Sequence, residues 1–242
     1  MAAAYGRRIS PMVAPYFNSP YRMSRMEMKK VNAEPTVYVV DDDAAVRNSL
    51  RFLIESAGFH VATFANAREF LTGYEGDGPG CLVLDVRLPG SSGLDLQQQL
   101  VAEGITIPVI IVTGHGDVPI AVRAMRTGAL DFIEKPYDDQ VLLDRIRHAV
   151  ELDNRNRRDR AQRQDILARV ALLTPREREV LDGVVGGSAN KQIAGDLGIS
   201  TKTVEAHRAH VMEKMRVESL AELVRLVQIA GVARPPVPAG AR

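Results

Sequence analysis

The chain has little cysteine, no long apolar run and almost no net charge. Among its 242 residues Cys81 is the single cysteine, so an intrachain disulfide and zinc sites built from cysteine pairs are excluded. One cysteine also fits a reducing compartment, and we expect a cytoplasmic protein. No apolar run reaches the length of a membrane span, so we expect no membrane partner. The length allows one large or two ordinary domains.

The formal net charge of +1 hides an uneven distribution of charge. Lys and Arg outnumber Asp and Glu by 6 to 2 in residues 1–34 and by 16 to 12 in residues 151–242, whereas acids outnumber bases by 16 to 9 in residues 35–150. An acidic middle and a basic end predict two domains with different partners, and nucleic acid is the candidate partner of the second.

Both ends of the chain lack sustained periodicity. Residues 1–34 are rich in Met, Arg, Pro and Tyr, and residues 233–242 are rich in Pro and Ala. Because of this composition we predict that both segments are disordered. Arg7 and Arg8 suggest a twin-arginine export signal, but prolines interrupt the apolar stretch that such a signal would need. Met26 and Met28 lie just before the first predicted strand, and we also hypothesise that translation starts there.

Residues 36–152 alternate β-rich runs with amphipathic stretches of helical length. The β-rich runs are residues 36–41, 60–64, 81–86, 108–114 and 130–135. The helical stretches are about residues 44–57, 66–74, 93–103, 118–128 and 138–152. Five such units with short connections predict an α/β domain over residues 35–150, with a five-stranded, doubly wound parallel sheet.

A buried strand that ends in an acid is the first candidate site. Leu82 to Leu84 show no polar alternation, as is typical of a strand buried on both faces, and Asp85 follows directly. Ligands of open α/β sheets bind at the carboxyl ends of the strands. Asp85 is therefore a site candidate, although an acid that merely caps a loop would show the same local pattern.

Polar residues end three other strands and should converge on the same edge. They are Asp41, Asp42 and Asp43 after the first strand, Thr113 at the end of the fourth and Lys135 at the end of the fifth. We assign Asp43 to helix capping. Three carboxylates repel one another unless a cation joins them, and all-oxygen ligands favour Mg²⁺. The set predicts a carboxylate that accepts a phosphoryl group, although Thr113 alone fits an ordinary strand residue and Lys135 a solvated one.

Four sequence blocks resemble those of response-regulator receiver domains. The blocks VVDDD, LVLDVRLPG, VTGHGD and DFIEKP carry the resemblance across residues 36–155, and the stretch from Gly114 to Pro136 is especially similar to the FixJ-like branch. The resemblance implies a flavodoxin-like fold that promotes only its own phosphotransfer and dephosphorylation, and is otherwise not an enzyme. It also implies the following roles: Asp85 as phosphoacceptor, Asp42, Asp85 and the backbone carbonyl of Arg87 as Mg²⁺ ligands, Asp41 assisting through water, Thr113 and Phe132 as a switch pair, and a cis peptide before Pro136.

A second domain of helices follows a polar linker. Residues 151–165 contain one large apolar residue, Leu152, so this stretch can continue a helix but not bury one, and we place the linker at residues 151–169. Capping signals then predict four helices within residues 170–232, beginning near Thr174, Asn190, Ser200 and Ser219. The turn at residues 198–200 makes a helix-turn-helix of the second and third helices.

The third helix should contact DNA with one face. Val204, His207, Val211 and Met215 recur at core spacing, with His207 as a satisfied core histidine. The complementary face, with its edges, comprises Thr201, Lys202, Glu205, Ala206, Arg208 and Ala209. Glu205 could read cytosine or instead pair with Arg208. Phosphate contacts are expected from Lys191, Lys202, Thr203 and Lys214.

The segments LTPREREVL, NKQIAGDLGIS and TKTVEAHRAHVMEKM resemble the LuxR-type output domain of the NarL/FixJ family. The resemblance implies a DNA-binding unit that dimerises through its last helix, near residues 220–227. We interpret the chain as a two-component response regulator: a sensor histidine kinase phosphorylates Asp85, the surface of residues 118–135 rearranges into a homodimer, and promoter DNA is bound, with activation through RNA polymerase expected.

Two rival functions remain open. A haloacid-dehalogenase-type phosphatase needs a second acid two residues after its nucleophile, where this chain has Arg87. A protein-interaction module would use the C-terminal helices to contact polymerase rather than DNA. Such a module would bind no DNA, or bind it without dependence on salt.

Overall fold

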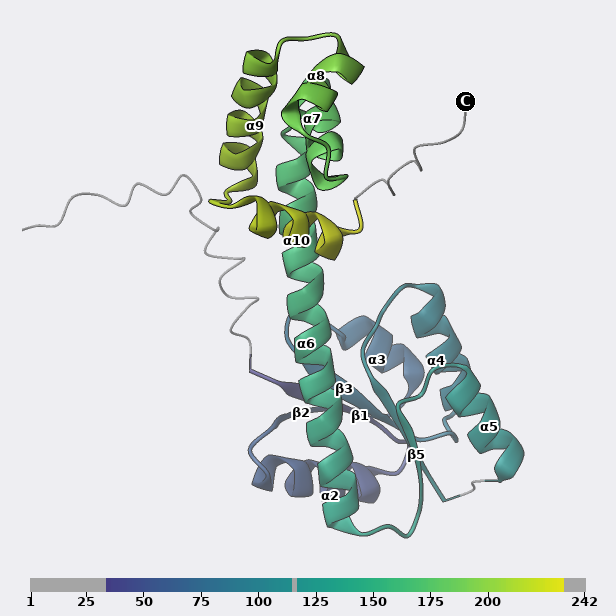
Figure 1. Ribbon diagram of the computed structural model, residues 1–242. Coiled ribbons are helices and arrows are strands. Elements are labelled where there is room, and N and C mark those ends of the chain that lie inside the picture. Colours follow the sequence, from purple (N-terminus) through teal and green to yellow (C-terminus); the bar gives the residue numbers. More distant parts are fainter. Residues whose placement is uncertain (1–33, 115–116, 233–242) are drawn as a thin grey trace, which may run out of the picture.

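A computed structural model describes residues 34–114 and 117–232, so the predicted N-terminal extension, apart from Glu34, and the C-terminal tail lie outside the described residues. An α/β domain and a helical domain are joined by one long helix, α6 (Asp139–Ala171) (Figure 1). In the described part of the chain, no helix combines the length and apolarity needed to cross a membrane.

The sheet of the first domain has five parallel strands in the order β2-β1-β3-β4-β5. The strands are β1 (Thr36–Val40), β2 (His60–Phe64), β3 (Gly80–Leu84), β4 (Val109–Thr113) and β5 (Asp131–Glu134). The order reverses between β1 and β3, which is where a doubly wound sheet opens its ligand crevice. The predicted fold class is confirmed: β2 has the predicted bounds, and the ends of the other strands lie within two residues of the predicted ones.

Helices cover both faces of this sheet. They are α2 (Ala44–Ser56), α3 (Ala67–Gly73), α4 (Gly93–Ala102), α5 (Val118–Arg126) and the first half of α6. One core joins α3, α4 and α5 to one face of the strands, and a second core joins α2 and α6 to the other face. Every residue of β3 and β4 is buried, which explains the uninterrupted apolar runs of these two strands.

The second domain contains α7 (Pro175–Val185), α8 (Asn190–Leu197), α9 (Thr201–Met215) and α10 (Leu220–Ala230). The predicted N-caps are confirmed: Thr174 forms a capping box with Glu177, and Ser200 and Ser219 accept from backbone amides of α9 and α10. Gly198 takes a left-handed conformation that ends α8. Val204, Val211 and Met215 of α9 are buried as predicted, but His207, predicted as a core histidine, is only half-buried and lies outside the apolar core.

The linker segment differs from the prediction in one respect. It continues α6 without a break, as the composition allows, but the expectation that it buries nothing is wrong for Asp153, which is 1% exposed. Farther along, Ile166 and Val170 belong to the core of the helical domain. Helix α6 is therefore shared by both domains.

Candidate functional site: an acidic cluster at the sheet edge and an exposed helix

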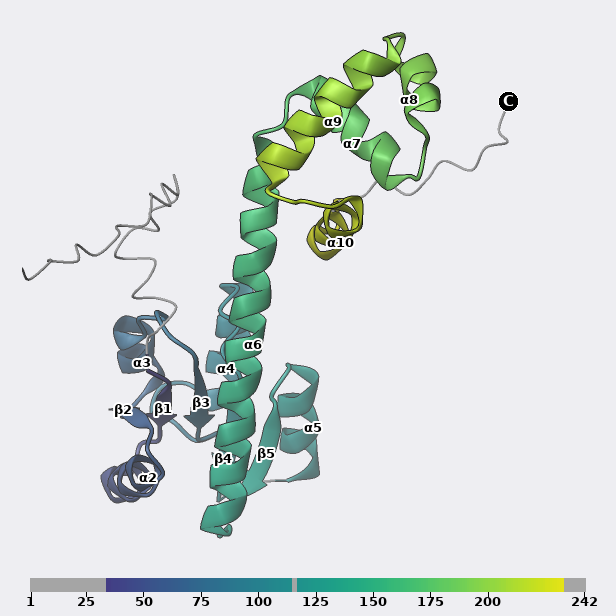
Figure 2. The ribbon, with the colours of Figure 1, turned by 60° about the vertical axis from the view of Figure 1, so that its left-hand side comes forward.

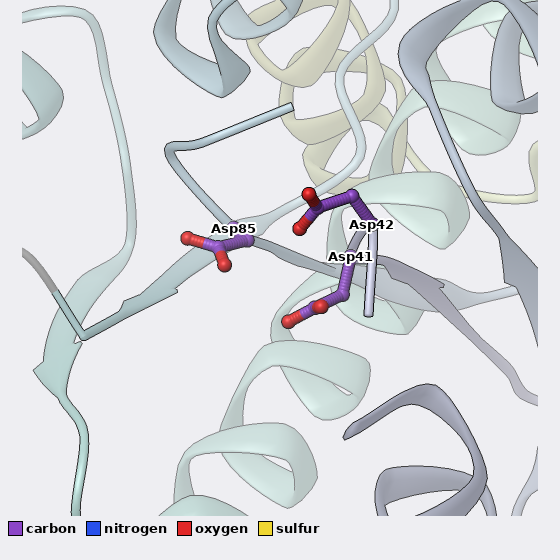
Figure 3. Close-up of side chains that lie close together, drawn as sticks. All are labelled: Asp41, Asp42 and Asp85. Atoms are coloured by element: carbon purple, nitrogen blue, oxygen red, sulfur yellow. The ribbon is translucent and has the colours of Figure 1, made fainter. Parts of the chain in front are cut away.

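Three carboxylates meet at the carboxyl edge of the sheet. Asp41 and Asp42 follow β1, Asp85 follows β3, and one oxygen of each lies within 4.8 Å of the others. Figure 3 shows the three side chains converging from these adjacent strands. Asp41 is buried, Asp85 is half-buried and Asp42 is exposed, so the cluster is open to solvent on one side.

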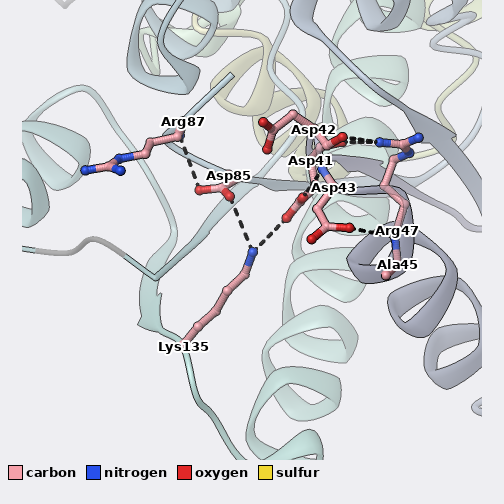
Figure 4. Close-up of polar contacts among 8 residues, drawn as sticks. All are labelled: Asp41, Asp42, Asp43, Ala45, Arg47, Asp85, Arg87 and Lys135. Carbon is pink, nitrogen blue, oxygen red and sulfur yellow. Dashed lines mark hydrogen bonds and ion pairs between the residues drawn. The ribbon is translucent and has the colours of Figure 1, made fainter. Parts of the chain in front are cut away.

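Asp41 is the most constrained of the three acids. Its Oδ1 accepts a hydrogen bond from the backbone N–H of Asp43 at 2.9 Å, and its Oδ2 accepts one from Lys135 Nζ at 2.7 Å. Asp85 is held less tightly, because Lys135 Nζ lies 3.4 Å from its Oδ2 and the Arg87 N–H lies 3.3 Å from its Oδ1 (Figure 4). The acid that the sequence singles out is thus the more available for chemistry.

Lys135 supplies a positive charge inside the cluster. Burial by itself lowers the pKa of this ammonium, but the hydrogen bond to Asp41 and the charges of Asp85 and Asp41 outweigh burial and raise its pKa above the ordinary 10.5. Lys135 therefore stays protonated at neutral pH. Its backbone N–H donates to the Thr113 carbonyl at 2.9 Å, and the Lys135–Pro136 peptide is cis, as predicted.

The donor set fits a small divalent cation. It offers carboxylate oxygens only, as Mg²⁺ prefers. The single ammonium of Lys135 neutralises only part of the charge of the three carboxylates, so negative charge remains for a cation to neutralise. Both oxygens of Asp41 accept short hydrogen bonds of 2.9 and 2.7 Å, whereas the two to Asp85 are longer, at 3.3 and 3.4 Å. Asp42 and Asp85 are therefore the residues better able to hold the ion directly.

A glycine fixes the backbone beside Asp85. Gly93 begins α4, and its N–H donates to the Val86 carbonyl at 2.8 Å. A Cβ at Gly93 would lie 2.0 Å from the Asp85 carbonyl oxygen, closer than any side chain tolerates. Ser92 caps the helix and bridges to Arg87, so the loop that presents Arg87 is closed tightly under the site.

The predicted switch residues lie on the neighbouring strands. Thr113 is the last residue of β4 and is fully buried, and Phe132 of β5 is partly buried against the core under α4 and α5. In the β4–β5 register Ile111 pairs with Phe132 and Thr113 pairs with Glu134, so Phe132 lies two residue pairs away from Thr113. Because side chains alternate along a strand, two residue pairs of separation leaves both positions on the same face of the sheet.

Arg47 is a site residue that the sequence analysis missed. From α2 its guanidinium donates to the backbone carbonyls of Asp41 and Asp42 at 2.8 and 2.9 Å, which fixes the acid-bearing loop (Figure 4). An arginine in the first turns of a helix has no distinctive sequence signal, because most such residues are solvated. The predicted N-cap of this helix, Asp43, is confirmed by its bond to Ala45 N.

Helix α9 presents the second candidate surface. Its predicted DNA-facing residues Thr201, Lys202, Thr203, Glu205, Ala206 and Ala209 are all exposed, and so is Lys191 of α8. Figures 1 and 2 both show α8 and α9 at the end of α6 away from the sheet. The receiver-like domain therefore leaves this helix-turn-helix uncovered.

Two predicted contacts on this surface need correction. Lys214 donates to Glu177 Oε2 at 2.6 Å and to the Leu172 carbonyl at 3.3 Å, so its ammonium joins α9 to the start of α7 and is not a free phosphate contact. Arg208 is half-buried and donates to Asn190 of α8, which gives it a partner other than the Glu205 that the sequence offered.

The two domains match two family models. Residues 37–147 match the response regulator receiver domain, and residues 171–227 match the luxR family of bacterial regulatory proteins. The chain is 49% identical over 196 residues to the transcriptional regulatory protein FixJ of Bradyrhizobium diazoefficiens, an alignment that covers 81% of this chain and 96% of that protein. It is 45% identical over 203 residues to nodulation protein W of the same organism, covering 84% and 89%.

Two full-length solved structures extend the comparison. The response regulator StyR has 48% identity and a TM-score of 0.75, covering 81% of this chain and 99% of its own. Full-length FixJ from B. japonicum has the same identity and similar coverage, 82% and 98%, but a TM-score of 0.50. Because both family models match and these relatives are 45 to 49% identical over about four-fifths of the chain, the chain belongs to the FixJ-like response regulators and is a two-component regulator of transcription with a LuxR-type DNA-binding domain.

Proposed function

We propose that Asp85 accepts a phosphoryl group from the phosphohistidine of a sensor kinase. The carboxylate oxygen attacks phosphorus, an O–P bond forms, the N–P bond of the donor breaks, and the imidazole leaves with the bonding electrons. The observation that carries this proposal is the position of Asp85 at a strand end, within 4.8 Å of two further acids and beside Lys135. A Mg²⁺ ion held by Asp42, Asp85 and the Arg87 carbonyl would neutralise charge on the transferring group.

Four further residues have roles in the phosphoryl transfer and in the response to it. Lys135 stays cationic and offers its ammonium to the new phosphoryl oxygens, since it already lies 3.4 Å from Asp85. Asp41 holds that ammonium in place and, through water, supports the ion. The Thr113 hydroxyl then turns toward the phosphoryl group, and the Phe132 ring moves into the space that the threonine leaves.

The phosphorylated protein forms a homodimer through the surface of α5 and β5. Val118, Val122 and Met125 recur along α5 and are 76%, 43% and 48% exposed, an apolar stripe that a second copy can cover. Dimerisation presents two helix-turn-helix units to paired half-sites in promoter DNA, with further pairing through α10 near residues 220–227. Activation through RNA polymerase in the cytoplasm completes the proposal.

Substitution of the acceptor tests the first step. Wild-type protein and Asp85→Asn are incubated with acetyl phosphate and Mg²⁺, and phosphorylated protein is measured by intact mass. We expect one phosphoryl group per wild-type chain and none on Asp85→Asn. Asp95→Asn, an exposed acid on α4, is the matched control and keeps full phosphorylation. Unchanged stoichiometry in Asp85→Asn would refute the assignment.

The output step is tested on DNA. Promoter fragments bound by the phosphorylated wild-type protein are mapped across the genome and compared with those bound by Asp85→Asn. We expect enrichment at paired half-sites only when Asp85 can be phosphorylated. Binding without dependence on salt, or no binding to DNA, would instead favour a protein partner for the C-terminal helices.

A further inference from the structure

The middle of α6 carries a row of polar contacts to the first domain. The Gly80 N–H donates to Asp153 Oδ2 at 3.0 Å, and the Arg157 guanidinium donates to the same oxygen at 2.7 Å and to the Gly76 carbonyl at 2.9 Å. One turn farther, Arg160 donates to the Thr106 hydroxyl. Positions 153, 157 and 160 lie on one face of the helix, so they continue the buried face formed by Ala149 and Val150.

These contacts lie in a segment of α6 that has few buried apolar side chains to hold it against the first domain. Between Val150 and Ile166 the helix buries only Asp153, and its remaining residues are exposed or partly buried. A carboxylate that is 1% exposed is costly to bury unless it is paired, and Arg157 with Gly80 supplies that pairing. The polar contacts therefore perform the attachment that apolar packing performs elsewhere in α6.

The attachment also fixes the orientation of the second domain about the axis of α6. Ile166 and Val170 join the second domain's core, while Ala149 and Val150 join the first domain's core. Sixteen residues separate Val150 from Ile166, and at about 100° per residue the two buried faces lie roughly 160° apart around the helix. Continuous helical structure between them thus determines where the DNA-binding domain lies relative to the receiver domain, as the two views in Figures 1 and 2 show.

We propose that Asp153, Arg157 and the backbone of Gly76 and Gly80 form a latch that holds α6 continuous and sets the placement of the DNA-binding domain. The two solved relatives differ in their whole-chain similarity to this protein. StyR and full-length FixJ have the same identity to this chain and similar coverage, yet their TM-scores are 0.75 and 0.50.

The latch is attached to the strand that carries the acceptor. Gly80 is the first residue of β3 and Asp85 follows its last residue, so the latch and the acidic cluster lie at opposite ends of one fully buried strand, about 16 Å apart. Opening the latch leaves the acidic cluster intact. Phosphorylation of Asp85 by acetyl phosphate is therefore a control that a latch variant should pass.

The test measures the interdomain distance in the full-length protein. Spin labels are placed on Glu55→Cys and Gln228→Cys, two exposed sites in different domains, and the distance distribution is recorded by pulsed electron resonance. The native Cys81 is fully buried, and burial raises the pKa of its thiol strongly, so it stays unlabelled. Arg157→Met is compared with Arg158→Met, which removes the same charge from the adjacent exposed residue.

We expect a single narrow distribution for the parent and for Arg158→Met, and a width at least doubled for Arg157→Met. Amide hydrogen exchange of residues 151–160 should accelerate at least tenfold in Arg157→Met alone. Asp153→Asn, which keeps an acceptor for Gly80, is the second variant and should also broaden the distribution. Unchanged widths in both latch variants would overturn the proposal. Unfolding of the whole receiver domain in Asp153→Asn would overturn it too, because the pair would then stabilise the domain and not a separable latch.

Discussion

Protonation of Glu177 should selectively destabilise the DNA-binding domain. Its Oε2 accepts from Lys214 Nζ at 2.6 Å and from the Thr174 N–H at 2.8 Å. The hydrogen bond to Lys214 and then those to Thr174 outweigh burial and lower the pKa of Glu177 from 4.5 to about 2. Because the pKa is lower in the folded protein, the charged carboxylate contributes stability above pH 4.5, and this contribution is lost as pH falls toward 2.

The size of the contribution follows from that shift. At about 1.4 kcal/mol per pH unit the lowered pKa corresponds to at most about 3.5 kcal/mol. Lys214 is 34% exposed, so solvent screens the pair, and we expect about 1 to 2 kcal/mol at neutral pH. Glu177→Gln removes the charge but keeps an oxygen that can accept from Thr174, which isolates the ionic part of the interaction.

Urea unfolding of full-length Glu177→Gln at pH 7 and pH 3 is the assay. Tyr38, Tyr74 and Tyr137 lie in the receiver domain and no tyrosine lies in residues 170–232, so a change in tyrosine fluorescence reports on the receiver domain and not on the DNA-binding domain, while circular dichroism at 222 nm follows the helices of both. We expect a lower midpoint for the helical transition at pH 7 and a smaller difference at pH 3. Glu179→Gln, whose pair with Arg176 is about half-exposed, is the control and should change stability by less than about 0.5 kcal/mol. Equal effects of the two substitutions, or a Glu177→Gln effect independent of pH, would refute the reasoning.

Three further outcomes are expected. Gly93→Ala should destabilise the receiver domain by about 1 to 3 kcal/mol in thermal unfolding, because its Cβ would lie 2.0 Å from the Asp85 carbonyl; an unchanged melting temperature would contradict the close approach. Lys202→Ala should reduce the slope of log affinity for DNA against log salt by about 1, whereas Lys214→Met should leave the slope unchanged; equal slopes would contradict the distinction. Lys135→Met should tighten Mg²⁺ binding several-fold in calorimetric titration, because it removes a positive charge from the acidic cluster, and weaker binding would count against that electrostatic role.

The sequence alone determined the two folds and most of the acidic cluster. Strands buried on both faces must be apolar throughout, so the runs that end at Asp41, Asp85 and Thr113 were recognisable, and parallel strands bring their carboxyl ends to one edge. Caps such as Ser200 were equally local, since a hydroxyl and the amides that it accepts from are separated by three residues at most. The positions of the strand-end acids and of the helix caps could therefore be predicted from short-range sequence patterns.

Only the tertiary structure decided the roles of charged residues whose partners are distant in the chain. The sequence indicated no partner for Arg47 or Asp153 and predicted a DNA phosphate for Lys214. In the structure Arg47 donates to the backbone carbonyls of Asp41 and Asp42, Asp153 accepts from the amide of Gly80, and Lys214 donates to the carboxylate of Glu177. A charged side chain has no periodicity that reveals a partner 37 or 73 residues away. The free energy of such a contact depends on burial and on the geometry of both groups, and these exist only once the chain has folded.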